Sequence, residues 1–397
     1  MRRDRRPVTG SVLARLAALA GMLSLAGSAL TAGSAQASPA VAGARAGQRD
    51  ELSGVSCTSG ASCMAVGERG LVNKPVRTLA EQWAAGRWRV LATPSPSDVV
   101  GSELLAVSCA GPGRCVAVGF STRTSDAVFG LVQVWNGRTW RALRLPGASP
   151  SVQMLPTGVS CLRRGCLIVG SYASGPAYPL AFWVTGSSLR RLHPALPPHA
   201  AGAGFGGVSC TGSASCMAVG GQLRGSATPA LAESWNGRHW RVLATPNPPH
   251  AADSGLNQVS CVSAARCFAV GSVNYFNRTG VFARNAVWAG SRWRTVRLTG
   301  RQAGNPPLSA GSCTPTFTCL AVGVSQSARA FAQAWNGTVL RPAPARQIPG
   351  IGPTAIDCTS AARCVAVGLH GGTGQAFSAA AELWNGRTWR SLAPASP

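Results

Sequence analysis

Cysteine is the residue type in this sequence whose number and spacing best suit chemistry. The 397-residue chain contains fourteen cysteines, which stand as seven pairs in segments of the form VSCTSGASCMAVG. The pairs are Cys57 with Cys63, Cys109 with Cys115, Cys161 with Cys166, Cys210 with Cys216, Cys261 with Cys267, Cys313 with Cys319, and Cys358 with Cys364. An even number of cysteines at fixed local spacing in an exported chain indicates disulfides. We therefore predict one local disulfide in each of seven repeats.

Zinc binding is the other common use of paired cysteines, and the spacing argues against it. Zinc ligands usually stand about two to four residues apart with partner Cys or His residues. The sequence has neither C-x2-C nor paired histidines. Two cysteines across a tight hairpin face each other on neighbouring strands, at a distance that suits a disulfide. Cys161 and Cys166 are the pair most prone to deviate, because their turn is one residue shorter.

Groups for acid–base or nucleophilic catalysis do not gather in the sequence. The histidines are scattered over turns and linkers of different repeats: His193, His199, His239, His250 and His370. Glu81, Glu233 and Glu382 share one repeat position, which favours a scaffold role, and Asp357 replaces the serine that precedes a repeat cysteine. No nucleophile–base motif, phosphate loop or metal-ligand cluster is visible. We therefore expect a protein that is not an enzyme, without metal or cofactor.

The repeat itself must position any functional residue. Each unit of about fifty residues reads as four short strands, for example LLAVSC, CVAVG, LVQVW and WRALRLP, which we label A to D. Strands A and B flank the turn between the cysteines, and strands C and D form a hairpin across Asn-Gly. Short strands repeated at this period are typical of a β-propeller with one blade per repeat. We predict an all-β, seven-bladed β-propeller with four antiparallel strands per blade.

The tryptophans mark the second half of the repeat and help to delimit it. All twelve belong to it: Trp83, Trp88, Trp135, Trp140, Trp183, Trp235, Trp240, Trp288, Trp293, Trp335, Trp384 and Trp389. The third and sixth repeats have Leu189 and Leu340 near the place of the second Trp. The predicted blades span about 51–100, 101–152, 153–203, 204–253, 254–306, 307–351 and 352–397.

An export signal precedes the repeats. Residues 1–37 combine a basic start, an apolar stretch and the small-x-small site Ala35-Gln36-Ala37, which is typical of a signal peptide cleaved near Ala37/Ser38. Residues 38–50 are expected to form a flexible linker. No later run is long and apolar enough to span a bilayer. We predict a secreted, extracellular monomer; the paired arginines leave twin-arginine export open beside the general secretion route.

Arginines are expected to gather on one face of the disc. In a propeller the A-B and C-D turns share one face, and the C-D turns here carry Arg87, Arg138, Arg238, Arg292 and Arg387. The cysteine turns and outer strands add further arginines, and the chain carries a net charge of +25, or +21 once residues 1–37 are removed. Such charge suits a polyanion such as an anionic glycan or cell-wall polymer. It equally suits a solvated role in which charge protects blade edges from aggregation.

The opposite face collects the residues that do not repeat. The B-C loops are expected to carry the candidate ligand-binding set Tyr172, Tyr178, Arg224, Tyr275, Phe276, Asn277 and Arg278. Acidic residues predicted on this face are Glu68, Asp98, Glu103, Asp126 and Asp253. Variable loops on a rigid scaffold commonly carry binding sites. Plain loop packing is the alternative explanation for the exposed tyrosines.

The C-D hairpin resembles a known motif. LAESWNGRHW resembles the end of the Asp-box of sialidase-type propellers, S-x-D-x-G-x-x-W, with Trp235 in the place of the Asp and Glu233 in that of the Ser. The Asp-box is a folding element, and the sialidase set of three arginines, a tyrosine and a glutamate does not map onto this chain. The cysteine-pair and W-N-G-x-x-W repeats are also similar to those of secreted propellers of high-GC Gram-positive bacteria. Both resemblances imply fold and location.

These observations predict a secreted, non-enzymatic binding or scaffold propeller, with an anionic cell-surface polymer or glycan as its candidate partner. The alternative is a glycan-active enzyme, of glycoside hydrolase or lyase type, whose site lies at the central channel on the B-C and D-A face. Two or more carboxylates, or a Tyr–Glu pair, converging at the channel mouth would favour the enzyme.

Overall fold

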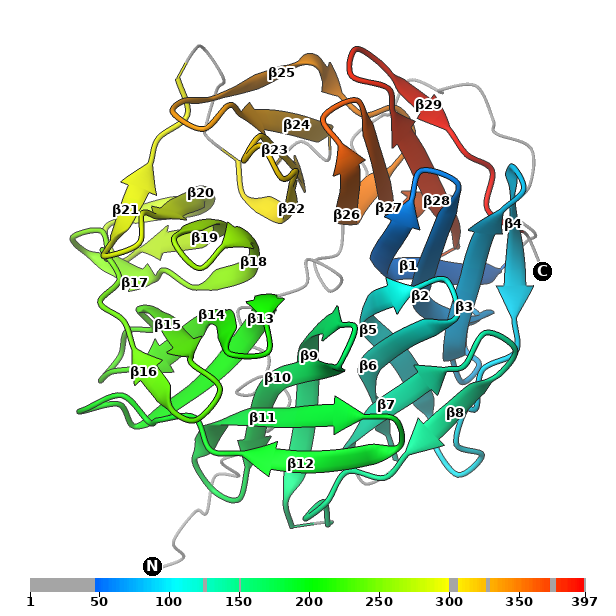
Figure 1. The fold of residues 1–397 in the computed structure, drawn as a ribbon, viewed down its shortest axis with the longest axis horizontal. Coiled ribbons are helices and arrows are strands. Elements are labelled where there is room, and N and C mark those ends of the chain that lie inside the picture. The colour runs from blue at the N-terminus through cyan, green and yellow to red at the C-terminus, as the bar shows by residue number, and fades with distance from the viewer. Residues whose placement is uncertain are drawn as a thin grey trace, which may run out of the picture.

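The computed structural model describes residues 47–123, 127–149, 151–299, 306–325, 329–371 and 376–395. These residues form seven antiparallel blades arranged in a ring around a central channel (Figure 1). The all-β, seven-bladed propeller predicted from the repeats is therefore confirmed. The described residues form no helix, so none of them forms a helix that could cross a membrane. The proposed signal peptide lies outside the described residues.

The strands of each blade follow one another in the chain, from the channel to the rim. Blades one to three comprise β1 (Gln48–Ser59), β2 (Ser62–Leu71), β3 (Arg77–Ala84) and β4 (Arg87–Leu91); β5 (Gly101–Gly111), β6 (Arg114–Thr122), β7 (Val128–Trp135) and β8 (Trp140–Leu143); and β9 (Gln153–Leu162), β10 (Gly165–Ala173), β11 (Ala177–Thr185) and β12 (Ser188–Leu192).

The remaining blades repeat this order. Blades four and five comprise β13 (Gly202–Gly212), β14 (Ser215–Leu223), β15 (Ala230–Trp235) and β16 (Trp240–Val242); and β17 (Ala251–Asp253), β18 (Leu256–Ser263), β19 (Arg266–Tyr275), β20 (Arg278–Trp288) and β21 (Trp293–Val296). Blades six and seven comprise β22 (Leu308–Cys313), β23 (Cys319–Val324), β24 (Ala330–Trp335) and β25 (Leu340–Gln347); and β26 (Gly352–Ser360), β27 (Arg363–Gly371), β28 (Phe377–Trp384) and β29 (Trp389–Ser391).

The strands are longer than the sequence pattern indicated. β1 begins at Gln48, so its first three residues, which the sequence placed in the linker, belong to blade one. β17 pairs with β19, so it belongs to blade five and not to blade four as predicted. In most blades strands A and B also continue past the cysteines, as in the pairing of Ser59 with Ser62, because the facing cysteines extend the ladder toward the turn.

The core lies between blades rather than within them. Side chains of one sheet pack against the facing sheet, as where Leu167 and Ala181 of blade three meet Phe205 and Trp235 of blade four. The strand A edges line the channel and contact one another around the ring (Figure 1). Within each blade, the repeat glycine at the end of the C-x-A-V-G segment permits the close pairing of strands A and B, because a Cβ on Gly119 would lie 2.0 Å from the Glu103 carbonyl oxygen. Burial of this apolar surface is the main stabilisation of the ring.

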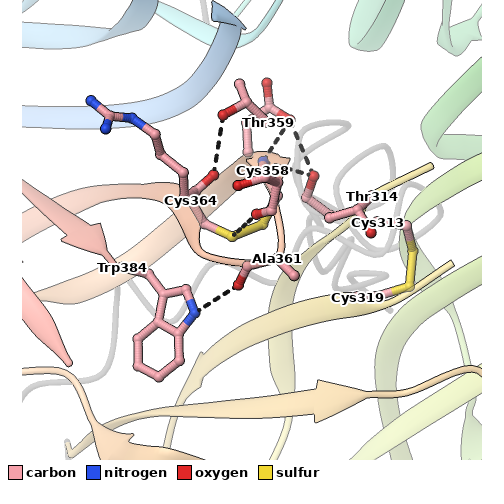
Figure 2. The surroundings of a disulfide bond; sticks show 12 residues. Cys313, Thr314, Cys319, Cys358, Thr359, Ala361, Cys364 and Trp384 are labelled. Carbon is pink, nitrogen blue, oxygen red and sulfur yellow. Dashed lines mark hydrogen bonds between the residues drawn. A yellow bond between two sulfur atoms is a disulfide. The ribbon is translucent and has the colours of Figure 1, made fainter. Parts of the chain in front are cut away.

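All seven predicted disulfides are present, and no described cysteine is free. Each joins directly facing residues of strands A and B, with Cα atoms 3.9–4.0 Å apart. Cys161 and Cys166 also face each other and are bonded, so the shorter turn causes no exception. Figure 2 shows the disulfides Cys313–Cys319 of blade six and Cys358–Cys364 of blade seven.

A belt of hydrogen bonds links neighbouring blades beside the disulfides. In six blades the serine before the first cysteine accepts a hydrogen bond from the backbone N–H of the next blade's first cysteine, at 2.9–3.0 Å. These serines are Ser56, Ser108, Ser160, Ser209, Ser260 and Ser312. The seventh acceptor is Asp357, whose Oδ2 lies 2.7 Å from the Cys57 nitrogen. The belt therefore continues across the seam between the first and last blades.

Blades seven and one are not consecutive in the chain, so the backbone connects them only through the other blades. Each blade is formed by consecutive strands and no strand is exchanged, as predicted, but a parallel bridge between Arg49 of β1 and Phe377 of β28 joins the sheets of blades one and seven. Beyond the Asp357 bond, the Thr354 hydroxyl donates to the Leu52 carbonyl at 2.6 Å, and Arg49 lies over the Phe377 ring at 5.1 Å. Polar contacts thus reinforce the apolar packing that closes the ring.

Candidate functional site

The A-B and C-D turns lie together on one face of the disc, as predicted. The indole N–H of the first Trp of the hairpin donates to an A-B turn carbonyl, as Trp384 does to Ala361 at 3.2 Å (Figure 2). The same bond joins Trp135 to Pro112 at 3.2 Å. These bonds fix the height of the C-D turn against the A-B turn. We call the surface formed by these turns the turn face.

The Asn-Gly sequence of the hairpin holds an arginine outward on the turn face. The Asn136 side-chain oxygen accepts hydrogen bonds from the backbone N–H groups of Arg138 and Thr139, both at 2.9 Å. Gly137 has a φ of 96°, which glycine adopts readily. Asn236 and Asn385 hold Arg238 and Arg387 in the same way. The turn chemistry therefore explains why the arginine points to solvent in blades two, four and seven.

All five arginines of the predicted basic ring are exposed: Arg87, Arg138, Arg238, Arg292 and Arg387. Five further arginines on the outermost strands are exposed as well: Arg89, Arg141, Arg241, Arg294 and Arg390. Guanidinium groups in this setting can bind carboxylates or phosphates with two parallel hydrogen bonds. The turn face and the adjoining rim of blades one, two, four, five and seven therefore form a candidate anion-binding surface.

The arginines of the cysteine turns have a different role from the ring arginines. The Arg114 guanidinium donates to the Arg163 carbonyl of the next blade, and the Arg363 guanidinium donates to the Gly60 carbonyl across the closing seam. Arg266 lies 5.5 Å from the centre of the Phe317 ring. These three side chains link neighbouring blades, so they contribute less to a ligand surface than the C-D turn arginines.

Acidic residues are withdrawn from the outer surface. Asp50, Glu81, Glu233 and Glu382 are buried. Among the described residues, the single ion pair joins Arg123 to the exposed Asp98, 2.7 Å apart. The other exposed arginines of the described residues have no such ion pair, so the outside of the propeller carries nearly the whole positive charge.

The candidate ligand set on the B-C face divides into separate contacts. Tyr172 and Tyr178 pair across two strands and stack with ring centres 5.4 Å apart, and the Arg191 guanidinium lies 4.6 Å from the Tyr172 ring centre. The Arg224 guanidinium donates to the Gln222 side chain and to the Pro198 carbonyl. These contacts use the aromatic faces and donors that a ligand would need. They fit the packing explanation of these residues.

The fifth blade contributes the rest of that set. Tyr275 lies edge-on to Phe282, with ring centres 5.9 Å apart, inside blade five. Phe276 and Asn277 form the exposed turn that follows, and Arg278 begins the next strand. Phe276 is a large apolar side chain with 62% of its surface exposed. The contacts described for the set stay within or next to each blade, so they do not build one pocket over blades three to five.

Three carboxylates converge beside the channel between blades one and two. Glu51 and Glu68 face each other across β1 and β2, and Glu103 lies on β5 of the next blade. The Ser53 hydroxyl donates to the Glu103 carboxylate at 2.9 Å, which directs this side chain toward blade one. The sequence placed Glu68 and Glu103 in loops; both lie in strands. Asp126 lies outside the described residues.

Burial and mutual repulsion raise the pKa values of this cluster. Burial, together with the neighbouring Glu68 and Glu51, raises the pKa of Glu103 to about 8. Burial and the charge of Glu68 raise the pKa of Glu51 to about 7, while Arg49 opposes the shift. The pKa of Glu68 is raised by burial. Among the described residues no three His, Cys, Asp or Glu side chains are placed to hold a metal ion. A carboxylic acid protonated near neutral pH can donate a proton.

Sequence reasoning gave this cluster too little weight, although a signal was present. Glu51 and Glu103 occupy the same repeat position, where the third and fourth blades have Leu155 and Gly204. Neighbouring strand A positions meet at the channel, so a carboxylate repeated in adjacent blades predicts a cluster. The position of Glu68 on the adjoining strand completes it.

The buried glutamates of strand C act as scaffold residues. The Glu81 carboxylate accepts from the Ala395 N–H at 3.0 Å, and the Glu233 carboxylate accepts from the Ala195 N–H at 3.2 Å. In blade two the same repeat position holds Gln133, which donates to the Pro94 carbonyl because proline lacks an N–H. Each side chain thus matches the backbone group that the preceding blade presents.

The comparisons with known proteins identify the fold. No family model matches the chain, and no curated protein matches it in sequence. Many solved structures are similar. A chain of the mitotic checkpoint complex has a TM-score of 0.55 and 11% identity, over 91% of this chain and 100% of that one. The propeller domain of the Trilobed protease from Pyrococcus furiosus, described as having an open velcro topology, has a TM-score of 0.51 and 8% identity, over 87% and 98%.

A glycan-degrading enzyme is also among the similar structures. The GH74 xyloglucanase from Xanthomonas campestris has a TM-score of 0.51 and 12% identity, over 86% of this chain. The chain spans 59% of that enzyme's length. Identities this low show a shared propeller architecture, which supports many unrelated functions.

Proposed function

We propose that this protein is a secreted, non-enzymatic binding propeller whose turn face contacts an anionic polymer or glycan of the cell surface. The observation that carries the proposal is the separation of charge. The turn face and rim expose Arg87, Arg138, Arg238, Arg292 and Arg387 together with the outer-strand arginines, while four of the acidic residues are buried and three others cluster between blades one and two.

The disulfides support the proposed location. Disulfides persist in oxidising compartments and are rare in reducing ones. Seven of them in one chain agree with export, which the basic and apolar residues 1–37 would direct.

The test is binding to an immobilised anionic polysaccharide, polygalacturonate, with neutral dextran as the comparison. We expect the protein without residues 1–37 to bind polygalacturonate and not dextran. Replacing Arg138, Arg238 and Arg387 together by glutamine should weaken binding by about a thousandfold, since each of three charged hydrogen bonds contributes about 1.5 kcal/mol.

A matched control removes the same charge from the other face. Arg77, Arg224 and Arg329 are exposed at the B-C loops, so their replacement by glutamine changes net charge equally. The proposal requires this control to retain most of the binding. Equal losses in both triple variants would mean that net charge, and not the turn face, governs retention.

The channel carboxylates favour a second candidate function, a glycan-active enzyme. A pKa of about 8 for Glu103 and about 7 for Glu51 would let the cluster hold a proton at neutral pH. Such a group could protonate a glycosidic oxygen or a leaving group. The polysaccharide would approach from the B-C and D-A face.

Activity is tested on the same polysaccharides by release of reducing ends and by formation of unsaturated uronates. Glu103→Gln should abolish any cleavage. Glu233→Gln should retain it, because Glu233 is a buried scaffold residue on strand C of blade four and not a member of the carboxylate cluster. Absence of cleavage by the wild-type protein over a broad glycan panel would leave the binding function alone.

A further inference from the structure

A groove opens on the turn face between blades four and five. It has a volume of about 520 Å³, inside the range of about 300–1,000 Å³ that is typical of small-molecule sites. Its walls come from the cysteine turns and hairpins of both blades, including the buried Trp235 and Trp288 and the exposed Arg241. Several side chains along it carry hydroxyl groups: Thr211, Ser215, Ser234, Ser263 and Ser291.

The seam between blades one and two provides an internal comparison. The cavity there holds only about 10 Å³, although its lining residues occupy the same repeat positions. Ser56, Thr58, Ser62 and Met64 correspond to Ser209, Thr211, Ser215 and Met217, and the cysteines correspond as well. Among the nine residues that line the smaller cavity, two differ: Gln82 corresponds to Ser234, and Pro112 corresponds to Ala264. The wider groove also has Ser291 at the repeat position of Arg138. Two smaller side chains therefore accompany the open groove.

The difference between Gln82 and Ser234 changes the environment of the arginine on the neighbouring strand. In blade one the Arg89 guanidinium donates to the Gln82 side-chain oxygen at 3.4 Å. The corresponding pair in blade four is Arg241 and Ser234, which face each other across β15 and β16. Serine is too short to provide the same acceptor. The Arg241 guanidinium is therefore available at the wall of a groove lined with hydroxyl groups.

We propose that this groove binds one acidic sugar unit of the polymer, with its carboxylate at Arg241 and its ring hydroxyls on the serine and threonine side chains. The proposal rests on the anion-binding function of the turn face and specifies its ligand. The charge selects an anion. The hydroxyl groups select a polyol over a compact anion such as phosphate, because they need several hydrogen-bond partners along the groove. The Trp235 and Trp288 edges, with Leu243, add an apolar wall.

The test exchanges the two differing positions between the seams. Ser234→Gln with Ala264→Pro gives the groove the two larger side chains that line the small cavity between blades one and two. The exchange is conservative, since Ala264 and Pro112 occupy equivalent turn positions whose carbonyls accept the same tryptophan bond. Binding of glucuronic acid is followed by ligand-observed NMR and calorimetry, with glucose and inorganic phosphate as comparisons.

We expect the wild-type protein to bind glucuronic acid more tightly than glucose or phosphate. The exchanged variant and Arg241→Gln should each weaken this binding by about tenfold or more, the effect of losing one charged hydrogen bond. The reverse exchange, Gln82→Ser with Pro112→Ala, changes only the seam between blades one and two. It should leave the groove between blades four and five intact, so it gives a folded control. Glucuronic acid binding that survives both groove variants would overturn the proposal, as would tighter binding of phosphate.

The outcomes separate this inference from the proposed function. If wild-type protein binds polygalacturonate and the groove variants do so equally well, the turn face binds polymer but the groove is not its sugar subsite. If wild-type protein binds neither dextran nor polygalacturonate, the anion-binding function itself is wrong, whatever the groove does.

Discussion

Asp357 closes the hydrogen-bond belt at the seam between the last and first blades, and its removal should weaken the whole ring. Its carboxylate accepts three hydrogen bonds, from the Cys57 N–H at 2.7 Å, the Cys358 N–H at 3.0 Å and the Ser312 hydroxyl at 3.1 Å. The Ser312 oxygen also accepts from the Cys358 N–H, so that group keeps a partner. Asp357→Ala leaves the Cys57 N–H without an acceptor. We expect a loss of about 2–4 kcal/mol in the free energy of unfolding.

Asp357→Ser is the informative companion, because serine performs this role in the other six blades. Each of those serines binds the next blade's cysteine N–H at 2.9–3.0 Å. We expect Asp357→Ser to cost about 1 kcal/mol or less. Ser108→Ala breaks one belt bond between blades that the chain also connects, and should cost about 1 kcal/mol.

Urea unfolding followed by tryptophan fluorescence measures these differences, with disulfides intact in every variant. The reasoning requires Asp357→Ala to be the least stable of the three. If Asp357→Ser were as unstable as Asp357→Ala, the carboxylate would have a role that the belt does not explain. If Asp357→Ala matched the wild type, packing alone would close the ring.

Three further predictions concern the buried glutamates, the disulfides and the tyrosine pair. Burial raises the pKa of Glu233 to about 8, so the folded state binds its proton more tightly than the unfolded state does. Its contribution to stability is full at low pH and is lost as the pH rises toward that value, and Glu233→Gln should flatten the fall in melting temperature above about pH 5. Serine replacement of both Cys161 and Cys166 should lower the free energy of unfolding by about 2 kcal/mol, measured by urea unfolding; no loss would contradict the pairing. Tyr172→Ala should lower stability by about 1–2 kcal/mol through lost stacking on Tyr178 and Arg191, while polygalacturonate retention stays unchanged; lost retention would restore the B-C face as a ligand site.

The architecture was predictable because each repeat contains its own signals. Facing cysteines set the A-B register, the Asn-Gly turn set the C-D hairpin, and the tryptophans located both. The ends of the strands were harder to predict, because backbone pairing continues wherever a partner strand is present, as at Gln48 and at β17. The pattern alone does not reveal where that partner ends.

The site was harder to predict because contacts between blades join residues about fifty positions apart. The exposed arginines were predictable from the turn chemistry that holds Arg138. The carboxylates were visible one by one, but their meeting at the channel depends on which sheet face each occupies, as the Ser53–Glu103 bond shows. The groove lies between two blades and depends on how side chains such as Ser234, Ala264 and Ser291 pack there, so only the structure reveals it.

The salt dependence of polygalacturonate binding tests the central claim most directly. Each arginine that contacts a carboxylate contributes counterion release, so the logarithm of the binding constant should fall linearly with the logarithm of salt concentration. By analogy with single-stranded polyanions, replacing Arg138, Arg238 and Arg387 should reduce that slope by about two, and replacing Arg77, Arg224 and Arg329 should leave it nearly unchanged. An identical slope for the wild-type protein and the turn-face variant would contradict an anion-binding turn face.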